Sequence, residues 1–270
     1  MSKKIFFIDL DGTLMSDDKT ISEKNRDSLR RAADKGNYIV LTTGRAISNA
    51  RNIVKDLELT RPGCYLIAYN GATMYDCSAD CVLRSRKLPI EYAEYLYNEA
   101  HAAGIYIQTY SDTQVLAEAR TKELMYYIGK NKMSYRIEKD MWSMLNEEPP
   151  KMLLLDLDNK GRLEKFREDH LEWEKGKCIS FFSCPEYLEY CPLGATKGSG
   201  VQFFRQFLNI PHENTVAIGD QENDISMIQA AYVGVAMKNA EQKVKDCADY
   251  VSENDNNHSG VAEIIEKFCS

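Results

Sequence analysis

The carboxylates of Asp9 and Asp11 are the groups in this sequence whose type and spacing most directly suggest chemistry. They follow the apolar run 5–8, which predicts a strand buried on both faces of a parallel sheet, and ligands bind outside the carboxyl ends of such strands. Two carboxylates so close together do not both ionise without help, and Mg²⁺, a cation that prefers oxygen ligands, is the usual remedy. With that cation bound, one carboxylate could attack a phosphorus atom while the other transfers the proton.

Gly12 and Thr13 shape the turn that follows these carboxylates. Glycine lets the chain turn sharply at the end of the strand. The Thr13 hydroxyl is expected to hydrogen-bond local backbone and so to fix the turn.

A second acid-rich run follows another apolar stretch. Residues 215–218 predict a buried strand, and Asp220, Asn223 and Asp224 come directly after it. Gly219 allows a close approach of the backbone at this turn. The run therefore places two more carboxylates at a strand end.

Two further segments could hold an anion. Thr43-Gly44-Arg45 follows the buried strand 38–41 and is expected to open a helix, whose first N–H groups bind anions. Lys197 also precedes a predicted helix, although a lone lysine in such a place is usually solvated. Asn70-Gly71 is a strong hairpin-turn dipeptide between two short strands.

Strands and helices alternate in the first and last parts of the chain, which predicts an α/β fold with a doubly wound parallel sheet. Residues 85–189 break this alternation and predict an inserted α+β unit. A discontinuous domain of residues 1–84 and 190–270 is therefore expected to surround it. Its expected elements are strands 5–8, 38–41, 65–68, 73–75, 215–218 and 232–237, and helices 20–36, 47–57, 198–208, 225–231 and 259–268, the first opened by a capping box at Thr20 and Glu23.

The insertion contains a second Asp-Leu-Asp string, at 156–158, which lacks the following Gly-Thr and is expected to be a polar strand edge. Its expected elements are helices 89–104, 120–130 and 138–146, a charged helix ending at 175, and strands 105–110, 114–118, 152–155, 178–183 and 186–191.

Composition limits the compartment and the partners. The formal net charge of −7 argues against nucleic acid as the main partner. No signal peptide or membrane-spanning run is evident, so a cytoplasmic protein without a membrane partner is expected. The eight cysteines show no CxxC pair, and only four histidines could complete a zinc site, so free thiols are expected.

The order of these elements resembles the motif set of the haloacid dehalogenase-like phosphohydrolases. The matching stretches are DxDGT at 9–13, TGR at 43–45, a lysine at 197 and GDxxND at 219–224. The Asn-Gly-Ala sequence at 70–72 and the large insertion resemble the Cof-type subfamily in particular. The resemblance spans nearly the whole chain. It implies a Rossmann-like catalytic core, a cap domain at 85–189 for substrate specificity, and a Mg²⁺-dependent phosphatase that forms an aspartyl phosphate.

The resemblance also implies a role for each matching residue. Asp9 would be the nucleophile and a metal ligand, and Asp11 the general acid and base, with its backbone carbonyl on the metal. Asp220 would be the other metal ligand, and Lys197 would offset the charge that develops during transfer. The implied phosphate contacts are Leu10, Thr43, Gly44, Lys197 and Asn223, and the supporting residues are Asp224, Arg45 and Asn70.

Two other functions stay open at this point. A phosphomutase of the phosphomannomutase type shares the architecture and DxDGT, although the insertion shows no clustered arginines for a bisphosphorylated intermediate. A metabolite-binding regulator that has lost catalysis is also open, but the intact Asp9, Asp11, Lys197 and Asp220 argue against it. The expected partner is a small phosphorylated metabolite. The sequence indicates neither its identity nor an oligomeric state.

Overall fold

The chain forms two compact units, each with its own sheet. The computed structural model describes residues 3–111, 113–145 and 147–269. Unit 1 consists of Met1–Gly44, Ala50–Arg84 and Thr196–Ser270, and unit 2 of Arg45–Asn49 and Ser85–Ala195. The boundaries differ from those expected, because 45–49 and 190–195 group with unit 2. One reason is that strand β11 (Tyr187–Pro192) continues past residue 190.

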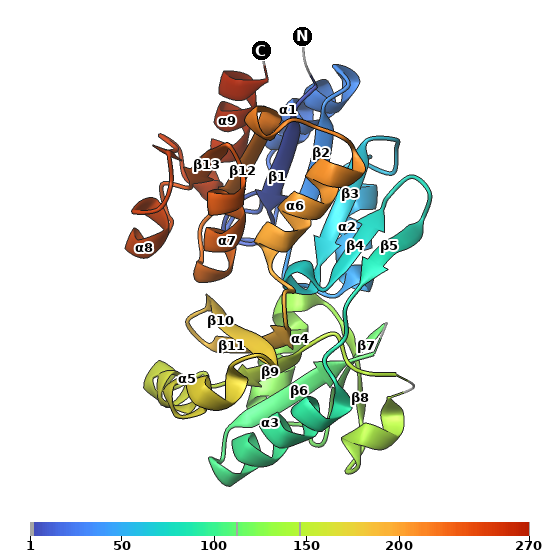
Figure 1. Ribbon diagram of the computed structural model, residues 1–270, viewed down its shortest axis with the longest axis vertical. Helices are drawn as coiled ribbons and strands as arrows, with labels where there is room; N and C mark the ends of the chain where they lie inside the picture. The colour runs from blue at the N-terminus through green and yellow to red at the C-terminus, as the bar shows by residue number, and fades with distance from the viewer. Residues whose placement is uncertain (1–2, 112, 146, 270) are drawn as a thin grey trace. The chain divides into compact units, whose positions relative to one another are not determined.

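Unit 1 contains an eight-stranded sheet with β1 near its centre (Figure 1). The strands from β14 to β3 are parallel, and β4 is antiparallel to β3. β1 and β12 are buried along their whole length, as the continuous apolar runs predict. In sheet order the strands are β14 (Tyr250–Val251), β13 (Val233–Ala236), β12 (Thr215–Gly219), β1 (Ile5–Asp9), β2 (Tyr38–Thr42), β3 (Cys64–Ala68), β4 (Thr73–Asp76) and β5 (Cys81–Ser85).

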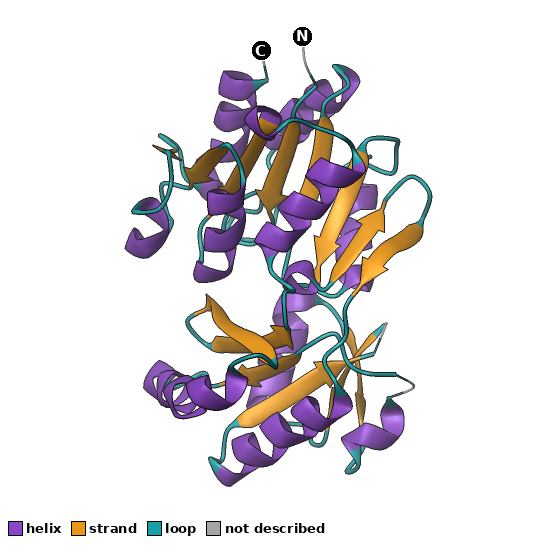
Figure 2. Cartoon of the chain, in the orientation of Figure 1, coloured by secondary structure: helices purple, strands orange, loops and turns teal. Residues whose placement is uncertain are grey.

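Helices cover both faces of this sheet, which confirms the predicted doubly wound α/β class (Figures 1 and 2). α6 and α7 pack against each other, and so do α1 and α9. The apolar core between α6, α7 and the sheet includes Phe7, Phe204 and Met227. The helices of unit 1 are α1 (Glu23–Asp34), α6 (Lys197–Phe207), α7 (Glu222–Ala230), α8 (Gln242–Lys245) and α9 (Gly260–Phe268), with 3₁₀ turns at Tyr69–Gly71, His212–Asn214 and Asn256–His258. α2 (Ile47–Asp56) belongs to unit 1 from Ala50 onwards.

The predicted start of the first helix is wrong. Ser22 caps α1 by accepting a hydrogen bond from the Asn25 N–H at 3.2 Å, whereas Thr20 lies before the helix and bonds to Ser16. Both residues are good caps in sequence, and the turn closed by Ser16 and Thr20 delays the helix by two residues. Two short elements, α8 and β14, were not expected.

Unit 2 has a six-stranded, mainly antiparallel sheet with α3 and α5 packed on one apolar face. In sheet order its strands are β10 (Cys178–Cys184), β11 (Tyr187–Pro192), β9 (Met152–Leu155), β6 (Tyr106–Tyr110), β7 (Gln114–Ala117) and β8 (Ser134–Ile137). Its helices are α3 (Ile90–Ala102), α4 (Lys122–Asn131) and α5 (Lys160–Glu174), with a 3₁₀ turn at Met141–Met144.

The helix expected over 138–146 is wrong. The chain forms β8 and then a single 3₁₀ turn, and residue 146 lies outside the described residues. The second Asp-Leu-Asp string lies in the bend after β9, whereas it was expected to be a polar strand edge. The carboxylate of its first member, Asp156, accepts hydrogen bonds from two backbone N–H groups and pairs with Arg162 at 2.8 Å.

Two expectations from composition can be compared with the structure. All eight cysteines lie in the described ranges, and none of them forms a disulfide there. Across residues 3–111, 113–145 and 147–269, each helix lacks the length or the apolar character needed to cross a lipid bilayer.

Candidate active site

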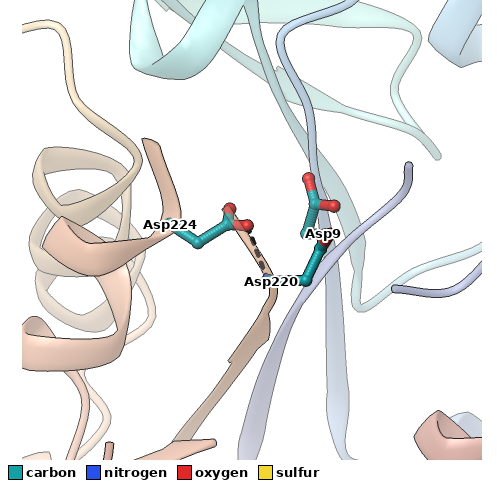
Figure 3. Close-up of side chains that lie close together, drawn as sticks. All are labelled: Asp9, Asp220 and Asp224. Carbon is teal, nitrogen blue, oxygen red and sulfur yellow. Dashed lines mark hydrogen bonds between the residues drawn. The ribbon is translucent and has the colours of Figure 1, made fainter. Parts of the chain in front are cut away.

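Three buried carboxylates meet at the carboxyl ends of β1 and β12. These strands are parallel neighbours with Ile8 opposite Ile218, so Asp9 and Asp220 emerge side by side. Asp224 joins them from the first turn of α7. One oxygen from each carboxylate lies within 4.8 Å of the others (Figure 3), and each residue is at most 5% exposed.

The ammonium of Lys197 bridges two of these carboxylates. Its Nζ lies 2.5 Å from Asp9 Oδ1 and 2.5 Å from Asp224 Oδ1, and its side chain is 1% exposed. Lys197 begins α6, which the Thr196 hydroxyl caps by accepting a hydrogen bond from the Ser199 N–H. The lysine is therefore part of a buried charge cluster and does not extend into solvent.

The turn after β12 holds Asp224 in place through its backbone. Asp224 Oδ2 accepts hydrogen bonds from the N–H groups of Asp220 at 2.9 Å and Gln221 at 3.1 Å. Figure 3 draws the first of these bonds. A side chain at Gly219 would place its Cβ 2.4 Å from the Cβ of Asp224, so only glycine permits this approach.

The turn after β1 fits against Asp220 in the same way. Gly12 has φ +80°, and a Cβ there would lie 2.3 Å from Asp220 Oδ2. The Thr13 hydroxyl was expected to hydrogen-bond local backbone. In the structure it donates a hydrogen bond to Asp220 Oδ1 at 2.8 Å. The hydroxyl thus joins two turns that are 207 residues apart in the sequence, and nothing in the local sequence indicates this bond.

Burial and mutual repulsion dominate the electrostatics of the cluster. Burial, with the neighbouring Asp224 carboxylate, holds the pKa of Asp9 well above its usual range despite the opposing charge of Lys197. The same two causes raise the pKa of Asp220 to about 7. Burial lowers the pKa of Lys197, but the carboxylates of Asp224 and Asp9 outweigh it and raise that pKa. The ammonium therefore stays charged.

The donor set fits a hard divalent cation. Three carboxylates face one ammonium, so the cluster has excess negative charge in a site with little solvent. Every candidate ligand in this group is a carboxylate oxygen, which suits Mg²⁺ and lacks the nitrogen and sulfur ligands that zinc favours. Burial raises the pKa of both Asp9 and Asp220, the charge of Asp224 adds to this, and a cation bound between the carboxylates would oppose both effects.

The predicted phosphate contacts lie at neighbouring ends of the same sheet. Thr43 follows β2, and its backbone bonds to Ile67 in β3 and to the N–H of Asn70. The Asn223 amide donates to Asn70 Oδ1 at 2.9 Å, while the buried Asn223 Oδ1 has no hydrogen-bond partner within the described chain. The segment 43–45 was expected to open a helix. The structure differs, because α2 begins at Ile47, three residues after Gly44.

Three further predicted site residues are Asp11, Arg45 and Leu10. The Asp11 carboxylate pairs with Lys19 Nζ at 2.7 Å. Arg45 groups with unit 2 and donates to Asn49 Oδ1 at 2.8 Å. The Leu10 side chain is fully buried, so only its backbone could contact a ligand. Lys19 was not predicted, and no motif in the sequence marks it.

Comparison with known proteins gives consistent matches along the whole chain. A family model described as haloacid dehalogenase-like hydrolase matches residues 6–265. A 5-amino-6-(5-phospho-D-ribitylamino)uracil phosphatase of Bacillus subtilis is 29% identical over 98% of this chain and 95% of its own length. A pyridoxal phosphate phosphatase of Escherichia coli is 29% identical over 98% of both chains. A crystal structure of a haloacid dehalogenase-like hydrolase from Bacteroides thetaiotaomicron superposes with a TM-score of 0.88 at 31% identity, covering 98% of this chain and 99% of that one.

Proposed function

The chain belongs to the haloacid dehalogenase-like hydrolase family, and from that membership we propose that it is a Mg²⁺-dependent phosphatase of small phosphorylated metabolites. The observation that carries the proposal is the buried Lys197 bridge between Asp9 and Asp224, with Asp220 beside it. The names of the Bacillus and Escherichia relatives suggest phosphorylated cofactors and their precursors as the substrate class.

In this proposal Asp9 attacks the phosphorus atom of a monoester and forms an aspartyl phosphate. Asp11 gives a proton to the departing oxygen, then takes one from the water that cleaves the aspartyl phosphate. The products are an alcohol and inorganic phosphate. Lys197 offsets the negative charge shared by Asp9 and the phosphoryl group, and its second bond to Asp224 fixes where its ammonium lies.

The cation would be held by the carboxylates of Asp9 and Asp220 and by the backbone carbonyl of Asp11. When bound, it would draw charge from the phosphoryl oxygens and lessen their repulsion with Asp9. Thr43, Gly44 and Asn223 would donate hydrogen bonds to the remaining phosphate oxygens. Asn70 would hold the Asn223 amide in place.

A screen for phosphate release tests this function. The purified chain, with Mg²⁺ present, should release phosphate from at least one member of a panel of sugar and cofactor phosphates. Binding of such a monoester without release would indicate a metabolite-binding regulator. Transfer of the phosphoryl group within the substrate would indicate a phosphomutase.

Mg²⁺ should bind more weakly at pH 6 than at pH 8. Because burial and Asp224 raise the pKa of Asp220 to about 7, this carboxyl is largely protonated at pH 6 in the metal-free protein. The cation must then displace a proton, which weakens binding by up to about tenfold for each pH unit below the pKa. Isothermal titration in two buffers of different ionisation enthalpy would measure affinity and proton release together. Equal affinity at both pH values, with no proton released, would contradict this account of Asp220.

We also propose that unit 2 sets substrate specificity. Apolar clusters lie within each unit, so unit 1 should fold when a Gly/Ser linker replaces residues 86–194, between the end of β5 and the start of α6. The truncated protein should keep Mg²⁺ binding and most activity on p-nitrophenyl phosphate. It should lose discrimination among metabolites, because binding energy from the rest of the substrate would be missing. If it ranked metabolites as the intact protein does, specificity would lie in unit 1.

A further inference from the structure

Asp11 does not share the environment of the other catalytic carboxylates. In the described chain the group of carboxylate oxygens within 4.8 Å of one another belongs to Asp9, Asp220 and Asp224. The Asp11 side chain is 38% exposed, against 6% for Asp9, and its Oδ1 lies 2.7 Å from Lys19 Nζ. Its carboxylate is therefore directed to a lysine that has no place in the motif set.

The backbone at Lys19 is held in an uncommon conformation. Lys19 has φ +59°, in the left-handed region that a residue with a Cβ seldom occupies. A closed turn maintains this conformation, because the Ser16 N–H donates to the Thr20 carbonyl at 2.9 Å and the Lys19 N–H to the Ser16 carbonyl at 2.9 Å. A strained backbone kept by such bonds is common where a side chain has to be placed for function.

The turn formed by residues 16–20 is also hydrogen-bonded to the C-terminal part of unit 1. The Asp17 N–H donates to Asn257 Oδ1 at 3.0 Å, and the amides of Asn256 and Asn257 donate to the Asp17 carboxylate, each at 3.0 Å. The Asn256 amide also donates to the Met15 carbonyl at 3.1 Å. The backbone segment from which Lys19 projects is therefore held in place on both sides.

We propose that Lys19 is a positioning residue that holds the Asp11 carboxylate away from the Asp9 cluster until a substrate enters. The inference rests on the proposed phosphatase function. The 2.7 Å ion pair with Lys19 gives the Asp11 carboxylate a partner that lies outside the cluster of Asp9, Asp220 and Asp224. To protonate a leaving oxygen, Asp11 has to break this pair and take up a proton from solvent. A partly exposed ion pair of this kind alters an equilibrium about two- to fivefold.

Lys19→Met keeps an unbranched side chain that is one atom shorter, with its Cβ, and removes the charge. The experiment compares kcat/KM for an alkyl phosphate that the wild-type protein hydrolyses with kcat/KM for p-nitrophenyl phosphate. An alkoxide needs a proton to depart, whereas p-nitrophenolate departs without one, so only the alkyl ester depends on Asp11 in the first step. Both substrates carry the same dianionic group, so the ratio of the two values removes any change in phosphate attraction.

The ratio of alkyl to aryl kcat/KM should rise two- to fivefold in Lys19→Met and return to the wild-type value in Lys19→Arg. Lys24→Met, which removes an exposed charge in the first turn of α1, is the matched control and should leave the ratio unchanged. Crystals of substrate-free Lys19→Met should show the Asp11 carboxylate turned away from residue 19. An unchanged or lower ratio, or an unmoved Asp11, overturns the proposal. A wild-type protein with no phosphate release at all would refute the phosphatase function instead.

Discussion

Asp9→Asn should fold normally and lose turnover by about four orders of magnitude or more, as removal of a nucleophile commonly does. The amide has nearly the size of the carboxylate but cannot form an aspartyl phosphate. Because burial and Asp224 already hold the pKa of Asp9 well above its usual range, a neutral side chain there relieves repulsion. The melting temperature of the metal-free variant should therefore equal or exceed that of the wild type.

Steady-state phosphate release and thermal unfolding measure these two outcomes. The chain supplies a matched control in its second Asp-Leu-Asp string, where Asp156→Asn makes the same chemical change in unit 2. That variant should retain activity within about twofold of wild type, since the Asp156 carboxylate accepts backbone hydrogen bonds in its own turn and pairs with Arg162, and has no part in the proposed reaction. Substantial activity in Asp9→Asn would mean that another group, such as an activated water, attacks phosphorus.

Removal of the divalent cation should abolish activity, and Mg²⁺ should restore it. Without the cation the cluster carries three carboxylates against one ammonium, and a dianionic substrate would add to that repulsion. Asp220→Ala should weaken Mg²⁺ binding by on the order of 100-fold or more, because loss of even a group that supports a ligand costs up to about that much. Calorimetric titration of Mg²⁺ measures this without reference to turnover.

Glu222→Ala is the control for the metal site. Glu222 lies in the same turn as Asp220, but its carboxylate pairs with Lys243 at 2.9 Å. This variant should bind Mg²⁺ with nearly wild-type affinity. Zinc should replace magnesium poorly, since the cluster has only oxygen ligands. Full activity after exhaustive chelation would exclude the proposed metal-assisted mechanism.

The sequence predicts the strand ends of this site well, because a continuous apolar run followed by acidic residues has few other structural solutions. β1 and β12 appear where expected, and their parallel pairing brings Asp9 and Asp220 together. The burial of Lys197 could not be predicted from the sequence. A lysine before a helix looks like surface, and its two partners lie 188 and 27 residues away in the sequence.

Other features depend on contacts that leave no local pattern. β8 (Ser134–Ile137) is short and partly exposed, and its pairing with β7 makes a strand of a segment for which no strand was expected. The pair formed by Lys151 and Glu189 is buried among the strands of unit 2, although both residues look like surface charges in the sequence. The Asp11–Lys19 pair depends on a left-handed residue that is not a glycine, so the usual signal for such a conformation is absent.

The strand order of unit 1 also determines when the central strand β1 can pair on both sides during synthesis on the ribosome. β1 lies between β2 and β12, and β12 begins only at Thr215. At about 5–20 residues per second, roughly 10–40 s separate the synthesis of Asp9 from that of Gly219. During that interval one edge of the central strand has no neighbour of its own, and such edges pair with other chains. A nascent chain that stalls before residue 215 is thus exposed to misassembly, and the arrival of β12 covers this edge of β1 and brings Asp220 beside Asp9 in the same event.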